Sequence, residues 1–481
     1  MHKPTLKFGT SGWRAILSDE FTFANVARLL DAITLFLREQ TGPSPTVVIG
    51  SDTRFLSDKF RQFAAQRLAH HGVNCLVTNR DCPTPVISFV IRNRHLAGGI
   101  NFTASHNPPE YQGLKFNPAD GAPANSNVTS RIESLIDAPV PPATASGSVS
   151  SLDPREDYFS ALFSHLDPDA LRSARLRVAC DVLYGTGRDY LDEALRRLGA
   201  HVTVLHDWLN PLFGGRRPEP APDNLEELIQ IVKDQQLDLG LATDGDADRF
   251  GVVDKGGRFF NANQVLCLTA WHLHKNRRRR GRIIRSVATT GYLDRIAHYL
   301  ATDIVEVPVG FKYIGPEIIA GNVLVGGEES GGLSIGGHVP EKDGILACLL
   351  IAELVAMERK TLADIWRDIE SAIGTLWSTR VDLTLSEDDK QRLLAWLRQA
   401  PRDSFLGRPV KAFNGIDGFK FTFNDTDWVL IRPSGTEPII RCYIESDNAA
   451  HGETLKADLL RELHSHVTSH SHSDTRHPSS P

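Results

Sequence analysis

The stretch Asn101–Asn117, NFTASHNPPEYQGLKFN, carries side chains that suit covalent group transfer. Ser105 supplies a hydroxyl, His106 follows it directly, and Lys115 comes ten residues later. Two consecutive prolines exclude helix, so the pattern predicts an extended and exposed loop. A hydroxyl beside an imidazole, with an amine within reach, is typical of a nucleophilic site. Taken alone, the stretch fits a proline-stiffened polar loop even better, because short motifs often occur by chance.

A second chemical stretch, DGDADR, begins at Asp244 and alternates aspartates with small residues. In an extended backbone this spacing turns the carboxylates of Asp244, Asp246 and Asp248 to the same side. Three converging carboxylates cannot all stay ionised without a cation, and hard oxygen ligands favour Mg²⁺. A calcium-binding EF-hand loop is excluded, because its later glycine and glutamate positions hold Arg249 and Lys255 here. An acidic surface turn remains the alternative.

Two glycine-rich stretches and one lysine offer groups to an anion or a sugar. FGTSGWR, which ends at Arg14, can present backbone N–H groups and a guanidinium to an anion, although it could equally be a structural turn. In GGEESGG, glycines flank Glu328 and Ser330, so the backbone can approach a ligand whose vicinal hydroxyls these side chains would bind. Lys342, just before an apolar helix, is placed to meet a phosphate.

A compact group of hydrogen-bond donors lies between two predicted strands near the C-terminus, in RPSGTEP. An arginine combined with hydroxyls and a glycine turn is typical of a phosphate-binding loop. The candidate phosphate ligands are Arg432, Ser434, Gly435 and Thr436, with Arg441 nearby.

Strands that alternate with helices position the serine and the aspartates. The runs Thr46–Gly50 and Leu96–Phe102, with helix-like segments between them, predict parallel βαβ units. In such sheets, ligands gather where loops leave the carboxyl ends of the strands. Leu96–Phe102 ends just before Ser105, and the strand Leu237–Ala242 leads in the same way into the aspartates.

One segment of the second unit resembles a nucleotide-binding fingerprint. The strand Leu176–Cys180 is followed by YGTG and by a predicted helix over Arg188–Leu198. The third glycine of the fingerprint is missing, because its position holds Tyr190. NAD binding is therefore disfavoured.

The remaining pattern predicts a third α/β unit and then a change of character beyond Thr379, where antiparallel strands and helices indicate an α+β unit. A Pro/Ala/Ser-rich linker, residues 138–151, separates the first two units. The predicted domains are an α/β domain with the serine loop (1–145), an α/β domain with the metal-binding loop (150–256), an α/β domain with the sugar-binding loop (257–372), an α+β phosphate-binding domain (376–467) and a disordered tail (468–481).

The whole composition indicates a globular cytoplasmic protein. The 481 residues exceed what one core can hold, and 41% are hydrophobic and 23% charged. There is no apolar run long enough to cross a membrane and no secretory signal at the start. The net charge of −6 predicts no general attraction to nucleic acid, and the basic run Lys275–Arg282 is interpreted as a solvated loop. Six cysteines without a Cys-x-x-Cys pair are expected to be reduced core residues.

FGTSGWR, TASHNPPEYQGLK, DGDADR, GGEESGG and RPSGTEP, in this order, resemble the motifs of the α-D-phosphohexomutase superfamily, and of phosphoglucomutases most. The resemblance covers residues 7–467. It implies four domains around a central cleft: three related mixed α/β sandwich domains and a C-terminal α+β domain. The division made above from strand and helix patterns agrees with that fold.

The resemblance also implies a chemistry. Ser105 would be a phosphoserine that passes its phosphoryl group to a hexose monophosphate and regains one from the resulting hexose 1,6-bisphosphate. Mg²⁺ would be held by Asp244, Asp246, Asp248 and the phosphate on Ser105, and glucose 1,6-bisphosphate would act as the activator. Lys115, with a pKa lowered by neighbouring cations, would be the general acid and base. His106 would assist it, and Arg14 and Arg249 would offset charge on the moving phosphoryl.

The substrate would be bound by groups on three later loops. Glu328 and Ser330 would hold the sugar hydroxyls, and RPSGTEP would hold the phosphate that does not react. Glu328-Glu329-Ser330 and Gly310-Phe311-Lys312 resemble phosphoglucomutases, so glucose is the expected sugar. Val309 departs from this pattern, because some phosphoglucomutases have a threonine there.

Other functions remain open at this stage. The runner-up is a phosphomannomutase or an enzyme acting on both glucose and mannose phosphates. A metal-dependent sugar phosphatase needs the same serine, metal and phosphate loop, but it does not need a second phosphate site. A catalytically silent regulator is disfavoured, because the serine, the lysine and the aspartates are all present. The expected partners are hexose phosphates, without nucleic acid or membrane, and the expected state is a monomer or weak dimer.

Overall fold

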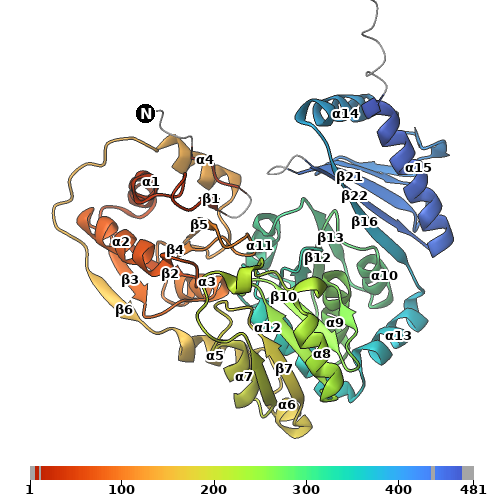
Figure 1. Ribbon diagram of the computed structural model, residues 1–481, viewed down its shortest axis with the longest axis horizontal. Coiled ribbons are helices and arrows are strands. Elements are labelled where there is room, and N and C mark those ends of the chain that lie inside the picture. Colours follow the sequence, from red (N-terminus) through yellow and green to blue (C-terminus); the bar gives the residue numbers. More distant parts are fainter. Residues whose placement is uncertain (1–5, 10–11, 435–438, 469–481) are drawn as a thin grey trace, which may run out of the picture. The chain divides into compact units, whose positions relative to one another are not determined.

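The computed structural model describes residues 6–9, 12–434 and 439–468. Its contacts divide the chain into two compact units (Figure 1). The first comprises Met1–Ser286 and Ile296–Asp368, and the second comprises Val287–Arg295 and Ile369–Pro481. Three mixed sheets lie in the first unit, whereas the second holds a five-stranded and a two-stranded sheet. The predicted architecture, three related α/β parts and an unlike C-terminal part, is confirmed.

The first sheet has the strand order β1-β5-β4-β2-β3-β6, with β2, β3, β4 and β6 parallel and β5 antiparallel to both of its neighbours. Its strands are β1 (Trp13–Ile16), β2 (Thr46–Ser51), β3 (Asn74–Thr78), β4 (Gly98–Phe102), β5 (Tyr111–Pro118) and β6 (Val149–Leu152). Its helices are α1 (Phe23–Thr41), α2 (Ser57–His70), α3 (Thr84–Asn93) and α4 (Ser126–Ser134).

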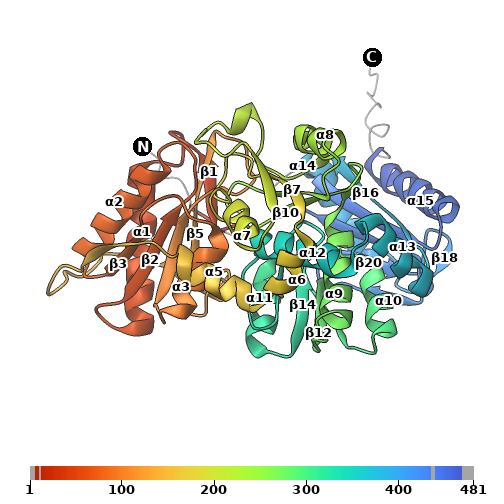
Figure 2. The ribbon, with the colours of Figure 1, turned by 90° about the horizontal axis from the view of Figure 1, so that it is seen from below.

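Helix α1 forms because capping and apolar spacing agree. Thr22 accepts a hydrogen bond from the Asn25 N–H at 3.3 Å and so caps the N-terminus. Val26, Leu29 and Ile33 recur at helical spacing, and all three are fully buried in the core that α1 shares with α2 and α4. Helix α3 packs against β2 and β4, so helices cover both faces of the sheet (Figure 2).

The predicted linker differs from the structure at its end. Val149–Leu152 forms β6, which pairs in parallel with β3 and so completes the first sheet. The residues of β6 are largely exposed, and its sequence VSSL carries little apolar signal. Strand β6 depends on hydrogen bonds to residues 75–78, a long-range pairing that local composition does not reveal.

The second and third sheets lie further along the first unit. The second has the order β11-β10-β9-β7-β8 and the third the order β13-β12-β14-β15. Their strands are β7 (Arg177–Asp181), β8 (His201–Leu205), β9 (Leu239–Thr243), β10 (Phe250–Asp254), β11 (Phe259–Phe260), β12 (Arg282–Ser286), β13 (Ile304–Val307), β14 (Val323–Gly327) and β15 (Leu333–Ile335). The helices that follow in sequence are α5 (Arg155–Ser164), α6 (Pro168–Ala174), α7 (Leu191–Arg197), α8 (Glu226–Asp234), α9 (Ala262–Lys275), α10 (Tyr292–Tyr299), α11 (Phe311–Ala320), α12 (Gly344–Glu358) and α13 (Leu362–Ile373). Two 3₁₀ turns, Phe213–Gly215 and Pro222–Asn224, precede α8.

The three sheets share one topology. In each, three parallel strands are followed by a strand antiparallel to the last of them, giving the orders β5-β4-β2-β3, β10-β9-β7-β8 and β15-β14-β12-β13. The connection into that antiparallel strand holds the serine loop in the first sheet, DGDADR in the second and GGEESGG in the third. The three chemical motifs therefore occupy equivalent positions in related folds.

Helix α12 forms a central part of the first unit. Its sequence is apolar on all sides and is buried from Gly344 to Ala356, as a helix without a polar face must be. It contacts α6, α7 and α9 as well as β9, β10 and β15, so it packs between the second and third sheets. Asp343 caps it by accepting the Leu346 N–H at 2.9 Å. This cap places Lys342 directly before the helix.

Helix α7 begins later than its sequence predicts, at Leu191 rather than Arg188. Asp189 has a φ of +60°, a left-handed conformation that an α-helix cannot contain. The residues before it form turns instead.

The second unit is built on an antiparallel sheet of order β16-β22-β21-β20-β19. Its strands are β16 (Trp377–Thr384), β19 (Ala412–Asn414), β20 (Phe419–Thr422), β21 (Trp428–Pro433) and β22 (Ile439–Ser446), and β17 (Ser404–Phe405) pairs separately with β18 (Arg408–Pro409). Helices α14 (Glu387–Gln399) and α15 (Ala449–Thr468) pack together over this sheet, as the α+β prediction requires. Buried Glu445 ties in residues 287–295 by accepting hydrogen bonds from Thr290 Oγ1 and the Gly291 N–H.

Two expectations from composition can be compared with the structure. All six cysteines are free and buried, as predicted. None of the described helices is long and apolar enough to cross a membrane.

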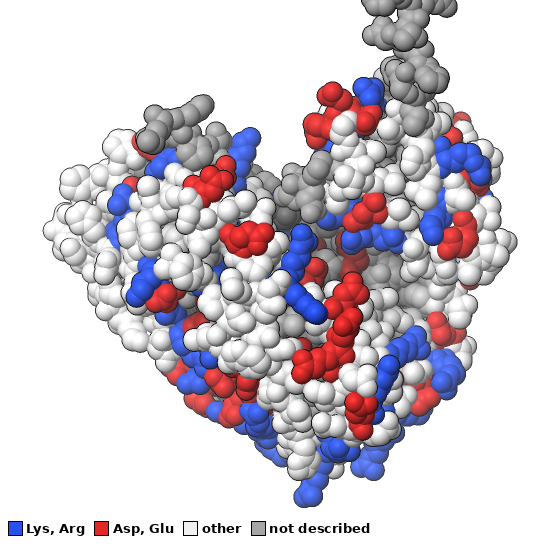
Figure 3. All heavy atoms as spheres, in the orientation of Figure 1, with Lys and Arg blue, Asp and Glu red and all other residues white. Residues whose placement is uncertain are grey.

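Basic and acidic side chains are interspersed on the face shown in Figure 3. Of the predicted tail, Thr468 is the last residue of α15, and residues 469–481 lie outside the described residues.

Candidate active site

The serine loop and the DGDADR turn meet within the first unit. Ser105 Oγ donates a hydrogen bond to Asp244 Oδ2 at 2.9 Å, and Lys115 Nζ donates to Asp246 Oδ2 at 2.6 Å. Gly245 lies so close to the Ser105 carbonyl oxygen that a Cβ on it would stand 2.9 Å away. Residues that follow strands of the first and second sheets are thus brought into contact.

Ser105 itself is neither extended nor exposed, so that part of the loop prediction is wrong. Its side chain is buried and its φ is +51°, in the left-handed region that costs a non-glycine residue about 1–2 kcal/mol. The Ser105 N–H donates to Thr103 Oγ1 at 2.8 Å, and His106 Nδ1 lies 3.4 Å from Ser105 Oγ. Contacts to the rest of the fold, not local preference, determine this backbone conformation.

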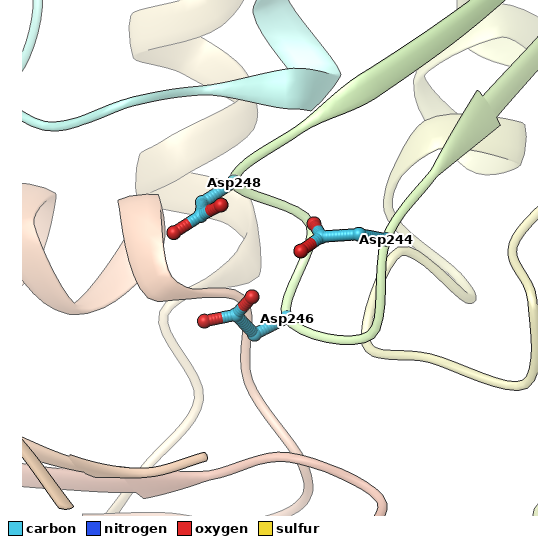
Figure 4. Close-up of side chains that lie close together, drawn as sticks. All are labelled: Asp244, Asp246 and Asp248. Carbon is cyan, nitrogen blue, oxygen red and sulfur yellow. The ribbon is translucent and has the colours of Figure 1, made fainter. Parts of the chain in front are cut away.

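The three aspartates converge, but they do so on a turn. Figure 4 shows their carboxylates facing one another between β9 and β10, with one oxygen of each within 4.8 Å of the others. The extended backbone expected from their alternate spacing is absent, because residues 245–249 form turns and bends and Ala247 has a φ of +56°. Asp246 Oδ1 and Asp248 Oδ1 are buried without a hydrogen-bond partner among the described residues. Three buried carboxylates with two oxygens left over fit a hard divalent cation.

Two lysines balance the charge of the aspartates. Lys115 Nζ contacts Asp248 Oδ2 at 2.8 Å, and Lys342 Nζ contacts the same oxygen at 3.0 Å. Burial opposes the ionisation of Asp246 and Asp248, but Lys115 lowers the pKa of both carboxyls, together with Thr84 at Asp246 and with Lys342 and Arg249 at Asp248. Asp244 contacts no lysine among the described residues, and burial together with the two neighbouring carboxylates raises its pKa well above the usual value.

The expectation of a lowered pKa for Lys115 is wrong. Burial does lower it, but the carboxylates of Asp246 and Asp248 outweigh burial, and the pKa of Lys115 is raised. The nearest charged groups are anions rather than the cations that the sequence suggested. Lys115 is therefore held as an ammonium ion in this arrangement.

Three further predicted residues surround the serine. Arg14 Nη1 donates to Asn107 Oδ1 at 2.8 Å, and burial lowers the pKa of Arg14. The Arg249 N–H donates to Asp244 Oδ1 at 2.9 Å. Burial works against the charge of Arg249, but the neighbouring Asp248 and Asp244 carboxylates outweigh it and raise its pKa. Burial and the Arg249 guanidinium hold the pKa of His106 well below its usual value, so its imidazole is neutral.

The GGEESGG loop contributes one buried carboxyl. Glu328 Oε1 accepts the Gly310 N–H at 2.7 Å, and burial together with Glu329 raises the pKa of Glu328 to about 7. Ser330 is exposed on the same loop. Lys312 is half-buried and donates to Ser126 Oγ at 3.4 Å, so it does not join the aspartate cluster by any contact described here.

The phosphate-binding residues predicted near the C-terminus belong to the second unit. Arg432 Nε donates to Asp417 Oδ2 at 2.8 Å, and the carbonyl oxygen of buried Ser434 accepts from Lys390 Nζ at 3.0 Å. Arg441 Nε lies 3.9 Å from Asp382 Oδ2. Gly435 and Thr436 lie outside the described residues.

Thr84 and Asn101 belong to the site although the motifs did not include them. Thr84 Oγ1 donates to Asp246 Oδ2 at 2.6 Å, and Asn101 Nδ2 donates to Thr84 Oγ1 at 2.9 Å. Asn101 is a fully buried polar residue within an apolar strand, which was a usable signal in the sequence. Thr84 begins a helix, and its sequence offered no comparable signal.

The glycines of YGTG support the DGDADR turn. A Cβ on Gly185 would lie 2.8 Å from the Gly245 carbonyl oxygen, and the Thr186 N–H donates to that oxygen at 3.0 Å. These glycines permit close backbone packing between two loops, which explains their spacing without a nucleotide.

Comparisons with known proteins agree along nearly the whole chain. Models of the phosphoglucomutase/phosphomannomutase alpha/beta/alpha domains I, II and III match residues 5–140, 156–257 and 261–372, and the model of the C-terminal domain matches residues 385–462. A phosphoglucomutase of Komagataeibacter xylinus is 30% identical, with 94% of this chain and 89% of the relative covered. A phosphoglucosamine/phosphogalactosamine mutase of Sulfurisphaera tokodaii is also 30% identical, with 95% and 98% covered. A solved phosphoglucomutase/phosphomannomutase family protein from Burkholderia thailandensis has the same fold, with a TM-score of 0.82 at 22% identity over 95% of this chain and 97% of that one.

Proposed function

Because the chain belongs to the phosphoglucomutase/phosphomannomutase family, within the α-D-phosphohexomutase superfamily, we propose that it interconverts glucose 1-phosphate and glucose 6-phosphate. The reaction would pass through a phosphoserine at Ser105 and a glucose 1,6-bisphosphate intermediate. The observation that supports this best is the hydrogen bond of 2.9 Å from Ser105 Oγ to Asp244, which puts a hydroxyl at the edge of a candidate metal site.

The metal of this proposal is Mg²⁺, held by Asp244, Asp246, Asp248 and an oxygen of the phosphate on Ser105. Asp246 Oδ1 and Asp248 Oδ1, which have no hydrogen-bond partner in the part of the chain that the structure describes, support this ligand set. A divalent cation bound there would withdraw charge from the phosphoryl oxygens and help to orient the group.

The transfer step needs one bond to break and one to form. The bond from phosphorus to Ser105 Oγ breaks as a sugar hydroxyl oxygen bonds to phosphorus, and in balance one proton passes from that hydroxyl to Ser105 Oγ. Lys115, kept protonated by its carboxylate neighbours, would donate the proton to Ser105 Oγ and recover the one lost by the sugar. Arg14 and Arg249 would offset the charge of the moving group, and neutral His106 would assist through its contact with Ser105.

The substrate must be bound in two orientations, since Ser105 would give its phosphoryl group to one end of the sugar and then take back the phosphoryl group from the other end. Glu328, Ser330, Gly310 and Lys312 would hold the sugar, and Lys342 would bind near the phosphoryl. The C-terminal loop with Arg432, Ser434, Gly435 and Thr436, together with Arg441, would bind the distal phosphate. A second phosphate site favours a mutase over a phosphatase, because hydrolysis does not require one.

Glucose is proposed as the sugar on the basis of Glu328-Glu329-Ser330. The middle residue is anchored, since Ser286 Oγ donates to Glu329 Oε2 at 2.8 Å. Mannose phosphate, alone or with glucose phosphate, is the second candidate, because the matching family description includes both activities. Relatives of similar identity that are named phosphoglucosamine mutases make glucosamine phosphate a third substrate to assay.

Phosphorus NMR would test the proposal directly. The protein would be mixed with Mg²⁺, a trace of glucose 1,6-bisphosphate, and in parallel the 1-phosphates of glucose, mannose and glucosamine. We expect fast conversion to the 6-phosphate in the glucose sample. Equal rates with mannose would establish a dual-specificity mutase, and release of inorganic phosphate without isomerisation would replace the mutase proposal by a phosphatase.

A further inference from the structure

Arg54 lies against the serine loop and binds it through both terminal nitrogens of its guanidinium group. Its side chain is buried, and each of its five N–H donors has an acceptor. Four of those acceptors are backbone carbonyl oxygens, three in the loop that joins β4 to β5 and one on Tyr111, the first residue of β5. They belong to Ser105 at 2.7 Å, Asn107 at 2.6 Å, Pro108 at 2.7 Å and Tyr111 at 3.1 Å.

The loop supplies only some of the donors that its carbonyls need: the Asn107 N–H donates to the Ala104 carbonyl oxygen at 3.0 Å and the Tyr111 N–H to that of Pro108 at 3.1 Å. Two successive prolines, Pro108 and Pro109, remove two N–H donors, and the chain has left the sheet that would otherwise pair it. Ser105 also adopts a left-handed conformation that its side chain disfavours. Such a conformation persists where surrounding contacts fix it, and the bond from Arg54 to the Ser105 carbonyl is one of those contacts.

Arg54 is held in place in turn by Asp52, at the end of β2. Asp52 Oδ2 accepts from Arg54 Nε at 3.1 Å, and Oδ1 accepts from the Arg54 N–H at 2.9 Å and from Ser57 Oγ at 2.8 Å. The Asp52 N–H donates to the Phe102 carbonyl oxygen at 2.8 Å, which continues the pairing of β2 with β4. Through Asp52, the Arg54 guanidinium is therefore tied to β4, the strand that directly precedes the Ser105 loop.

We infer that Arg54, fixed by Asp52, is a positioning residue for phosphoryl transfer: it sets the backbone of Ser105 and so directs Oγ towards Asp244. This inference rests on the proposed function. A lysine cannot replace the arginine, because an ammonium has three donors without the planar fork that spans four carbonyls. Arg54 does not touch the reacting atoms through its own side chain contacts, so its effect passes through the position of Ser105.

The test compares Arg54→Lys with Arg61→Lys. Arg61 is also buried in the first domain and also holds a loop, through Thr78 Oγ1 at 3.1 Å and the Arg80 carbonyl oxygen, but that loop carries no reacting group. Both variants should have a lower melting temperature than the parent protein. With glucose 1-phosphate and saturating glucose 1,6-bisphosphate, R54K should lower kcat by about 100-fold, as expected for a reacting group displaced by an ångström, with KM within about threefold. R61K should keep kcat within about twofold.

A second variant covers the case in which R54K does not fold. Asp52→Asn keeps the shape of the carboxylate but removes its charge, and kcat should fall by about tenfold at constant KM. A folded R54K, or a folded D52N where R54K is unfolded, that keeps kcat within threefold of the parent would overturn the inference. So would a crystal structure of R54K in which residue 105 keeps its left-handed backbone. If the parent protein converts none of the hexose phosphates, the proposed function fails instead, and the two failures are thereby distinguished.

Discussion

The β4–β5 loop and the β9–β10 turn occupy the same position in two sheets of the same topology, yet they are fixed by different means. The β4–β5 loop is held from outside, by Arg54 reaching across from the end of β2. The β9–β10 turn is held by backbone N–H groups instead. Within the turn, the Arg249 N–H donates to Asp244 Oδ1 at 2.9 Å and the Ala247 N–H to the Asp244 carbonyl oxygen at 3.0 Å, and from outside it the Thr186 N–H donates to the Gly245 carbonyl oxygen at 3.0 Å.

The difference suits what each segment carries. The nucleophilic hydroxyl of Ser105 must be oriented. A long side chain such as that of Arg54, anchored at the end of a strand, can fix a loop that lacks regular hydrogen bonds. Three carboxylates must be forced together, and a tight turn does this while Lys115 and Lys342 balance the charge. Substitutions that loosen the loop should therefore misplace the Ser105 hydroxyl, whereas substitutions in the turn should unbalance its buried charges.

The largest effect is expected from removing the nucleophile. Ser105→Ala should lower kcat by about 10⁴-fold or more, because no phosphoenzyme can form. Intact mass after incubation with glucose 1,6-bisphosphate should show one added phosphate on the parent protein and none on the variant. The turn should survive, so Mg²⁺ binding measured by calorimetry should remain within a few-fold of that of the unphosphorylated parent protein. Normal turnover by the variant would remove Ser105 from the mechanism.

The next effect concerns the charge balance of the turn. In Asp248→Asn, Lys115 and Lys342 lose the carboxylate that both contact. Lys115 keeps Asp246 and Lys342 keeps Glu341, but the buried cluster loses one negative charge, which should lower the free energy of unfolding by about 3 kcal/mol, measured by urea titration. The Mg²⁺ concentration for half-maximal activity should rise at least about tenfold. A shift of kcat alone, with stability and Mg²⁺ dependence unchanged, would mean that the turn is not organised by this charge cluster.

The third equivalent segment, GGEESGG, gives a pH-dependent prediction. Burial raises the pKa of Glu328 to about 7, above its ordinary value of 4.5. Between those values the unfolded chain releases a proton that the folded protein keeps, so stability falls as pH rises towards 7 and is constant above it. Relative to Glu328→Gln, the parent should therefore lose roughly 2–3 kcal/mol of unfolding free energy between pH 5 and pH 8. A constant difference across that range in urea titrations would contradict the raised pKa.

Sequence patterns predicted those features that depend on local chemistry. The alternation of strands and helices gave three related α/β parts, and the aspartate spacing identified the residues that cluster. The features that the sequence patterns did not predict depend on contacts between residues that are far apart in the chain. Ser105 takes its backbone from Arg54, which is 51 residues earlier. The aspartates converge through a turn packed against Gly185, and β6 exists only because residues 75–78 pair with it. The pKa of Lys115 was misjudged for the same reason, since Asp246 and Asp248 come from another sheet.

The smallest expected effect tests the contact between the two segments. A Cβ on Gly245 would lie 2.9 Å from the Ser105 carbonyl oxygen and 3.0 Å from the Pro218 ring, so Gly245→Ala must push the turn away from the loop by a few tenths of an ångström. Overpacking of this kind costs about 1–3 kcal/mol in stability. Because the shift is far smaller than the one expected without Arg54, kcat should fall only about tenfold. A fall in kcat as large as that expected for R54K would show that the turn orients Ser105, and that Arg54 contributes less than the turn does.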